Sequence, residues 1–226
     1  MEAFGGQFES LFVILHPFVS VPERLAWKAT KKYPADEQIL SLGSKCPWAF
    51  VASQTGIDTC ARLNQALLTS TKSIADELCD FSASSALQTF LQSGSIWMPG
   101  SGAFEPLLQM DYLAPFQAAG QEDLIFVPEF PNVDPIQRLD VSRLRNRQEP
   151  FPHRGTLAAL DESFLLTVDW DSFFTLFYGP REFVAEVARQ QNLGGFFATP
   201  TTDHFWFNYS LGCCVVTLAP EVWASA

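Results

Sequence analysis

The chain has 226 residues, of which 47% are hydrophobic and 17% are charged, and its net charge is −11. This composition excludes intrinsic disorder, and the length suffices for a substantial core without disulfides or metals. The acidity argues against nucleic acid or an anionic membrane surface as the main ligand, because both need clustered positive charge; a basic protein or a neutral small molecule fits better.

The first half of the chain reads as two short strands among many helices. In chain order we expect a strand at 11–15, helices at 23–32 and 35–42 after prolines, and a strand at 48–51. A helix at 59–68, capped by Asp58, precedes helices at 70–78, 82–92 and 102–119. Pro106 and Pro115 must then lie at a first turn or a kink.

The second half alternates strands and helices. We expect strands at 124–127, 164–168, 196–198 and 205–207, with 214–218 a weaker candidate. Helices are expected after Asp134-Pro135, at 172–178 after Asp171, and after Pro180. The proline- and arginine-rich stretch 128–152 is the best candidate for a surface crossing. We predict an α+β fold: one domain spanning 1–226, with a central mixed sheet of about six strands flanked by helices.

The cysteines indicate the compartment. Their number is odd, and their spacing does not suggest a disulfide framework, which favours a reducing environment; they are Cys46, Cys60, Cys79, Cys213 and Cys214. The first ten residues carry no basic region, and the apolar run 11–15 is too short for a signal peptide or a membrane span. We therefore expect a cytoplasmic protein, monomeric or weakly dimeric.

Several segments carry a resemblance to a known family. They are His16-Pro17-Phe18, residues 33–43 (YPADEQILSLG), residues 166–173 (LTVDWDSF), Gly195-Phe196-Phe197 and the region of Trp206. Over nearly its whole length the chain resembles a family of uncharacterised bacterial proteins catalogued as a domain of unknown function. The resemblance implies a bacterial, cytoplasmic, single-domain protein, and it implies no activity, cofactor or partner.

The most site-like motif is Asp169-Trp170-Asp171, where a predicted strand meets a predicted helix. If the strand continues through Asp171, both carboxylates share one face and could hold a cation or act as an acid–base pair. The simpler interpretation is that Asp171 caps the helix 172–178 and Asp169 is exposed. Trp170, Phe173, Phe174 and Phe177 have the spacing of one helical face, which we expect to be buried.

A second motif is Asp203-His204, in a polar turn between two aromatic strands. A histidine beside a carboxylate can be a general base, although adjacent strand residues point to opposite faces. The histidines are far apart and no zinc spacing occurs, so we expect neither a metal nor a cofactor. Cys213-Cys214 is best explained by core packing, and the loop 99–102 by a plain turn rather than an anion site.

Two classes of function remain open. The first is a non-enzymatic binding protein, including an inhibitor or immunity type, which the acidity and the aromatic richness favour. The alternative is a small-molecule enzyme, such as a hydrolase, that uses Asp169 and Asp171 or Asp203 and His204. In either case we expect Asp169, Trp170 and Trp206 to take part in binding.

Overall fold

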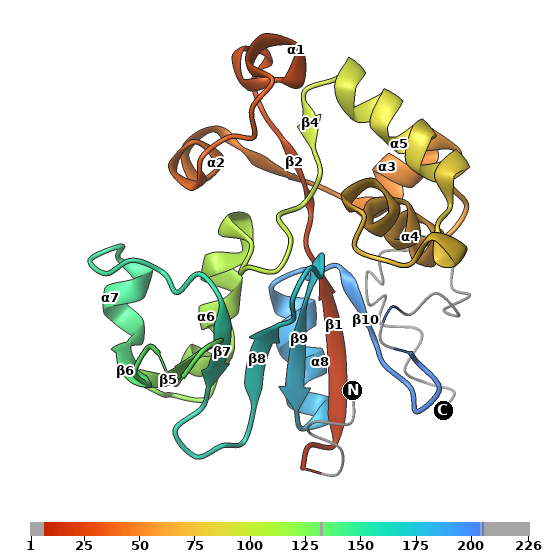
Figure 1. Cartoon of the computed structure of the whole chain (residues 1–226). Coiled ribbons are helices and arrows are strands. Elements are labelled where there is room, and N and C mark those ends of the chain that lie inside the picture. Colours follow the sequence, from red (N-terminus) through yellow and green to blue (C-terminus); the bar gives the residue numbers. More distant parts are fainter. Residues whose placement is uncertain (1–6, 132, 204, 206–226) are drawn as a thin grey trace.

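The computed structural model describes residues 7–131, 133–203 and 205. In these residues a seven-stranded sheet with the order β10-β1-β9-β8-β7-β5-β6 forms the centre, and a three-stranded sheet has the order β3-β2-β4 (Figure 1). Helices pack against the large sheet, which confirms the α+β class. All pairings in both sheets are antiparallel, so the expectation of a mixed sheet is wrong. Short turns join β7 to β8 and β8 to β9, and such turns return the chain antiparallel.

The strands of the large sheet are β1 (Ser10–Leu15), β5 (Asp123–Pro128), β6 (Gln137–Asp140), β7 (Gly155–Ala158), β8 (Leu165–Val168), β9 (Phe174–Gly179) and β10 (Gly195–Phe197). The small sheet consists of β2 (Phe18–Ser20), β3 (Ser44–Cys46) and β4 (Ile96–Trp97). The α-helices are α1 (Trp27–Thr30), α2 (Asp36–Leu42), α3 (Trp48–Thr55), α4 (Cys60–Thr71), α5 (Phe81–Ser93), α6 (Gln109–Ala118), α7 (Val141–Arg145) and α8 (Arg181–Gln190). Short 3₁₀ turns are η2 (Glu23–Leu25), η3 (Asp76–Leu78) and η4 (Pro106–Leu108).

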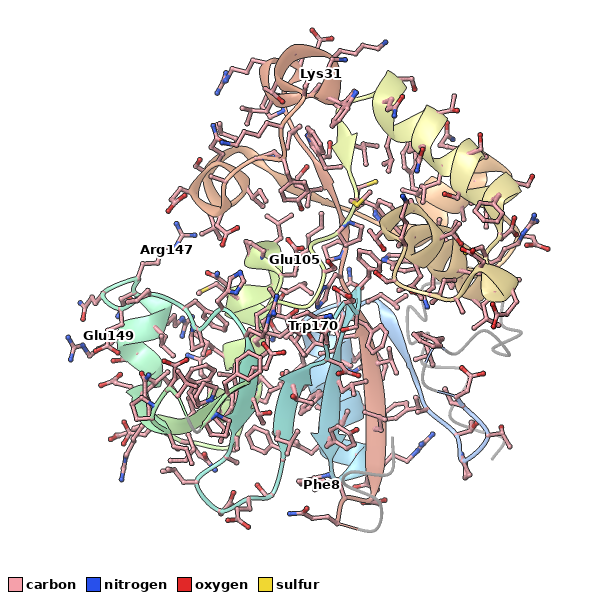
Figure 2. The ribbon with its side chains drawn as sticks, viewed as in Figure 1. Phe8, Lys31, Glu105, Arg147, Glu149 and Trp170 are labelled. Carbon is pink, nitrogen blue, oxygen red and sulfur yellow. The ribbon has the colours of Figure 1, made fainter. Side chains whose placement is uncertain are left out.

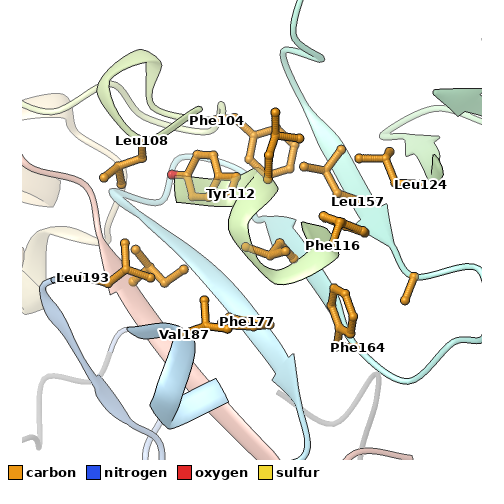
Figure 3. Packing of buried hydrophobic residues seen from close by; sticks show 14 of the residues in the cluster. Phe104, Leu108, Tyr112, Phe116, Leu124, Leu157, Phe164, Phe177, Val187 and Leu193 are labelled. Carbon is orange, nitrogen blue, oxygen red and sulfur yellow. The ribbon is translucent and has the colours of Figure 1, made fainter. Parts of the chain in front are cut away.

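Two hydrophobic clusters sandwich the middle of the large sheet. Along β1, Phe12 and Ile14 point into one cluster and Val13 and Leu15 into the other, as the alternation of a strand requires. Helices α6, α7 and α8 complete the first cluster, and α3, α4 and α5 complete the second. Figure 3 shows the first cluster, in which Tyr112 and Phe116 of α6 face Phe177 of β9.

The predicted strand at 48–51 is wrong, because this run begins α3. Pro47 is the N-cap of that helix and Gly56, at φ +70°, ends it. A short apolar run has the same pattern in a buried strand and a buried helix, so periodicity could not separate them. The predicted helix at 70–78 is wrong as well, since α4 ends at Thr71 and Lys72 turns the chain with a φ of +59°.

The predicted helix at 172–178 is also wrong: this segment forms β9. Phe173 and Phe177 are fully buried, as expected, but Trp170 is 59% exposed. β9 lies between β1 and β8 and is buried on both faces, so its apolar residues do not alternate and can imitate one face of a helix. Residue 171 therefore caps no helix.

Most of the other expected strands and helices are confirmed, and some have different bounds or caps. The strands at 11–15, 124–127, 164–168 and 196–198 are confirmed as β1, β5, β8 and β10, and the helices at 35–42, 59–68 and 82–92 as α2, α4 and α5. Thr59 rather than Asp58 caps α4, because its hydroxyl accepts the N–H of Arg62. The helix predicted at 23–32 is η2 and α1, the one predicted at 102–119 is η4 and α6, and the segment after Pro135 forms β6 instead of a helix.

The stretch 128–152 is mostly exposed, as a surface crossing should be, and it carries β6 and α7. The single-domain organisation of 1–226 stays a prediction. The candidate strand at 214–218 lies outside the described residues, and so does all of 205–207 except Phe205. Within the described part of the chain, the helices are too short or too polar to cross a bilayer.

Candidate functional site

The strand directions gather several candidate residues at one end of the large sheet. β1, β5 and β8 finish at this end, and β7 and β9 begin there, because neighbouring strands alternate in direction. We call it the Trp170 end, since the turn from β8 to β9 carries Trp170 (Figure 2). Glu129, Arg154 and Asp169 follow or precede these strands, so they belong to the same end of the sheet.

The turn itself is tightly hydrogen-bonded. The Asp169 carboxylate accepts the N–H of Trp170 at 2.8 Å, and the Asp169 carbonyl accepts both the hydroxyl of Ser172, at 2.7 Å, and its N–H, at 3.3 Å. Asp171 has a φ of +53°, a left-handed conformation that aspartate tolerates better than most residues. These contacts fix the backbone on both sides of Trp170 and leave its ring projecting from the turn.

Arg154 supports the ring of Trp170 from the sheet side. Its guanidinium carbon lies 5.0 Å from the centre of the indole, and its Nη1 lies 3.2 Å from the Glu129 carboxylate. The loop at Gly102 packs against Asp171 and Arg154. A Cβ at Gly102 would be crowded, because it would lie 3.0 Å from the Asp171 nitrogen. Of the carboxylates at this end, that of Glu129 pairs with the Arg154 guanidinium, and Asp169 and Asp171 lie in the turn that carries Trp170.

The loop 99–102 uses the N–H groups of two of its glycines inside the protein. The N–H of Gly100 donates to the Glu105 carboxylate at 3.2 Å, and the N–H of Gly102 donates to the Ser172 carbonyl at 2.9 Å. Both groups are therefore used inside the protein, as expected of a plain turn.

Glu105, which precedes η4, is fully buried. Its carboxylate also accepts the N–H of Leu107 at 3.4 Å. Burial raises the pKa of Glu105 to about 7, although these two hydrogen bonds oppose the shift and Asp36 adds to it. Through these hydrogen bonds the Glu105 side chain holds the loop 99–105 in place, and its carboxyl group titrates near neutral pH (Figure 2).

His16 connects the end of β1 to the same loop. Its Nδ1 lies 3.1 Å from the Gly100 carbonyl, and its Nε2 lies 2.8 Å from the Thr175 hydroxyl, which is 3.0 Å from that of Tyr112. Burial lowers the pKa of His16 to about 4, so the ring is neutral at pH 7. Since a carbonyl only accepts, Nδ1 of the neutral ring donates to Gly100, and Nε2 is the ring nitrogen that can accept from Thr175.

Of the predicted catalytic groups, Asp169 and Asp171 lie in the turn from β8 to β9, and Asp203 lies after β10. Asp203 is exposed in the turn after β10, which leaves the sheet at the end opposite to Trp170. His204 and Trp206 lie outside the described residues, so the Asp203-His204 hypothesis stays untested. Among the described residues, no group of three or more His, Cys, Asp or Glu side chains is placed to hold a metal ion.

Sequence reasoning missed Arg154, Glu129, Glu105 and His16 as partners at this end. Arg154 belongs to no local motif, and Glu105 falls within the helix expected at 102–119. The one available signal was Pro106, because a proline at the first helical position marks the preceding residue as an N-cap.

The fold and this end of the sheet define an α+β protein with an antiparallel sheet and a buried polar network beneath an exposed tryptophan turn. The chain belongs to the family described as "Protein of unknown function (DUF2711)", whose model matches residues 1–208. It is 23% identical over 210 residues to the uncharacterized protein YwbB of Bacillus subtilis (strain 168), covering 89% of this chain and 91% of that relative. No solved structure matches the chain.

Proposed function

We propose that the protein is a non-enzymatic binding protein and that the turn carrying Trp170 recognises a basic segment of a partner protein. The observation that carries the proposal is the exposure of Trp170, 59%, on a turn held by hydrogen bonds from Asp169 to Trp170 and Ser172. Tryptophan is the residue type most enriched among the residues that dominate binding energy in interfaces. An exposed indole on a rigid support loses little conformational entropy when a partner covers it.

The charges around Trp170 specify the kind of partner. Glu129, Asp169 and Asp171 outnumber Arg154, and the whole chain carries a net charge of −11. Arg154 occupies one face of the indole, and a lysine or arginine of the partner can stack on the other face. The surrounding carboxylates would attract such a cation and speed its approach.

An inhibitor or immunity role is one form of this function, since such proteins bind and neutralise a partner without chemistry of their own. We further propose that binding takes place in the cytoplasm. The free thiols of Cys46 and Cys79 support a reducing compartment.

The test is a titration with two peptides of equal length, acetyl-(Gly-Lys-Gly-Arg)₃-amide and acetyl-(Gly-Glu-Gly-Asp)₃-amide, followed by the indole signals in ¹H–¹⁵N spectra. We expect the basic peptide to shift the Trp170 signal in a salt-sensitive manner, and the acidic peptide to leave it unchanged.

Trp170→Ala should weaken binding of the basic peptide about threefold or more, as expected from the loss of one cation–π contact. The matched control is Phe81→Ala, which removes another exposed aromatic, 67% exposed, at the start of α5. Equal affinities of the two variants for the basic peptide would refute the assignment of the Trp170 turn as the binding surface.

A further inference from the structure

A second feature, separate from the Trp170 turn, is a cavity of about 130 Å³ between the large sheet and the helices α3 and α4. Its wall is mainly apolar and comes from distant parts of the chain: Leu15 at the end of β1, Trp48 of α3, Cys60 of α4 and Leu108 of η4. Cavities at such junctions of secondary structure elements are where small ligands commonly bind.

The wall is held in place by hydrogen bonds. The indole N–H of Trp48 donates to the His16 carbonyl at 2.6 Å, which fixes the ring against the end of β1. The N–H of Leu15 donates to the carbonyl of Gly194, another lining residue, at 2.8 Å. The cavity is therefore formed before any ligand arrives, and a ligand would not have to order its walls.

Among the described residues that line the cavity, Lys45 is the one with a charged side chain. Its ammonium group forms an ion pair with Asp111 of α6, whose side chain is 15% exposed. An ammonium has three N–H donors, and Asp111 is the one acceptor that contacts it among the described residues. Lys45 can therefore donate to a ligand while Asp111 balances its charge, so the cavity favours an uncharged ligand with an acceptor atom.

Size limits the ligand further. A cavity of about 150 Å³ lined by apolar side chains holds a molecule of benzene. We propose that this cavity binds a small uncharged molecule, a six-carbon ring or a branched chain of similar volume, which presents one hydrogen-bond acceptor to Lys45. This inference uses none of the residues of the Trp170 turn and does not depend on the function proposed for that turn.

The test uses protein labelled with ¹⁵N in its tryptophans and follows the indole signal of Trp48, assigned with Trp48→Phe. The probes are phenol, which is neutral and has an acceptor oxygen, benzene, which has none, and the charged molecules benzoate and benzylammonium. We expect phenol to shift the Trp48 signal in a saturable manner at millimolar concentrations. Benzene should bind about tenfold more weakly, because it lacks the hydrogen bond to Lys45, and both ions more weakly than phenol.

Three variants sharpen the test. Leu108→Phe should fill the cavity and abolish the phenol shift, whereas the neighbouring Leu107→Phe, outside the cavity wall, should retain it. Lys45→Met should reduce phenol to the affinity of benzene. Asp111→Asn leaves the charge of Lys45 unbalanced and should shift the preference from phenol to benzoate.

Two results would overturn the proposal: no saturable shift of Trp48 with phenol, or tighter binding of benzoate than of phenol by the wild-type protein. An unchanged phenol affinity in a folded Leu108→Phe variant would overturn it as well. If that variant does not fold, the Lys45 and Asp111 substitutions decide the outcome, because Lys45 is partly exposed and its replacement leaves the core intact.

Discussion

Replacing Glu105 with glutamine should reveal a pH dependence of the free energy of unfolding that two opposed titrations cancel in the wild-type protein. The pKa of the buried Glu105 rises from the ordinary 4.5 to about 7, chiefly because burial disfavours the carboxylate. Between these values the unfolded chain has lost its proton while the folded chain keeps it, so the stability falls as the pH rises. At about 1.4 kcal/mol per pH unit, the free energy of unfolding should drop by about 3 kcal/mol across this window.

His16 has the opposite effect over nearly the same range. Burial lowers its pKa from 6.5 to about 4, in spite of the hydrogen bond to the Gly100 carbonyl. As the pH falls through this window, the unfolded chain binds a proton that the folded chain does not, so the stability contributed by neutral His16 is lost by about 3 kcal/mol. Where the two windows overlap, between pH 4.5 and 6.5, the two slopes cancel and the contribution of this pair is flat.

The assay is urea unfolding, followed by far-UV circular dichroism, at steps of about half a pH unit. For Glu105→Gln the free energy of unfolding should rise by about 2 kcal/mol from pH 4.5 to 6.5, because of this pair only His16 still titrates. For His16→Asn, in which the amide can still donate to Gly100, it should fall by a similar amount. The comparison uses slopes, so a constant loss of stability in either variant does not affect it. Curves parallel to the wild type would refute the opposed titrations.

Three further outcomes concern stability, the first two in the same denaturant assay and the third in thermal unfolding. Phe173→Ala should lower the free energy of unfolding by about 3–5 kcal/mol, since its ring is fully buried, whereas Trp170→Ala should lower it by less than about 1 kcal/mol; similar losses would contradict the burial described for these residues. Asp171→Val should destabilise by about 1–2 kcal/mol, because a β-branched residue does not tolerate a φ of +53°, whereas Asp171→Asn should be nearly silent; equal effects would count against a left-handed turn. Gly155→Ala should cost more than about 2 kcal/mol, because its Cβ would lie 2.3 Å from the Val127 carbonyl oxygen; a thermal midpoint within a degree or so of the wild type would contradict this close approach.

The elements that the sequence predicts well have a signal of their own. β1, β5, β8 and β10 are apolar runs bounded by polar or turn residues, and α8 shows a clear amphipathic stripe after Pro180. α5 starts at an aspartate that accepts the N–H of Ala83, as an N-cap does. Such features depend on residues close in sequence, so they can be read without knowledge of the fold.

The elements that the sequence misses depend on contacts between distant segments. β2, β3 and β4 have two or three residues each and exist because Phe18 pairs with Cys46 and Val19 with Trp97. β7 has only four residues and is paired on both sides, with β5 and β8. No local pattern in so few residues separates a strand from a loop.

The same distinction applies to the candidate site. The motif 169–171 was identified because it follows an apolar run, a local signal. Its structural partners Arg154 and Gly102 come from other parts of the chain, and only the order of the strands brings them together. The roles assigned to Asp169 and Asp171 from a helix cap changed once the following segment proved to be β9.

Within four residues, the turn between β8 and β9 carries one residue that stabilises the fold, Phe173, and one that we propose to bind a partner, Trp170. β9 is paired on both sides, with β1 and β8, and Phe173, just before it, fills the core with a fully buried ring. Trp170 belongs to the same turn but contributes little to that core, since the turn is held by the hydrogen bonds of Asp169 and Ser172 rather than by its ring. A folded protein would therefore tolerate a smaller residue at position 170. If a partner binds here, Trp170→Ala should weaken binding with a nearly unchanged free energy of unfolding, and this combination separates a recognition residue from a structural one.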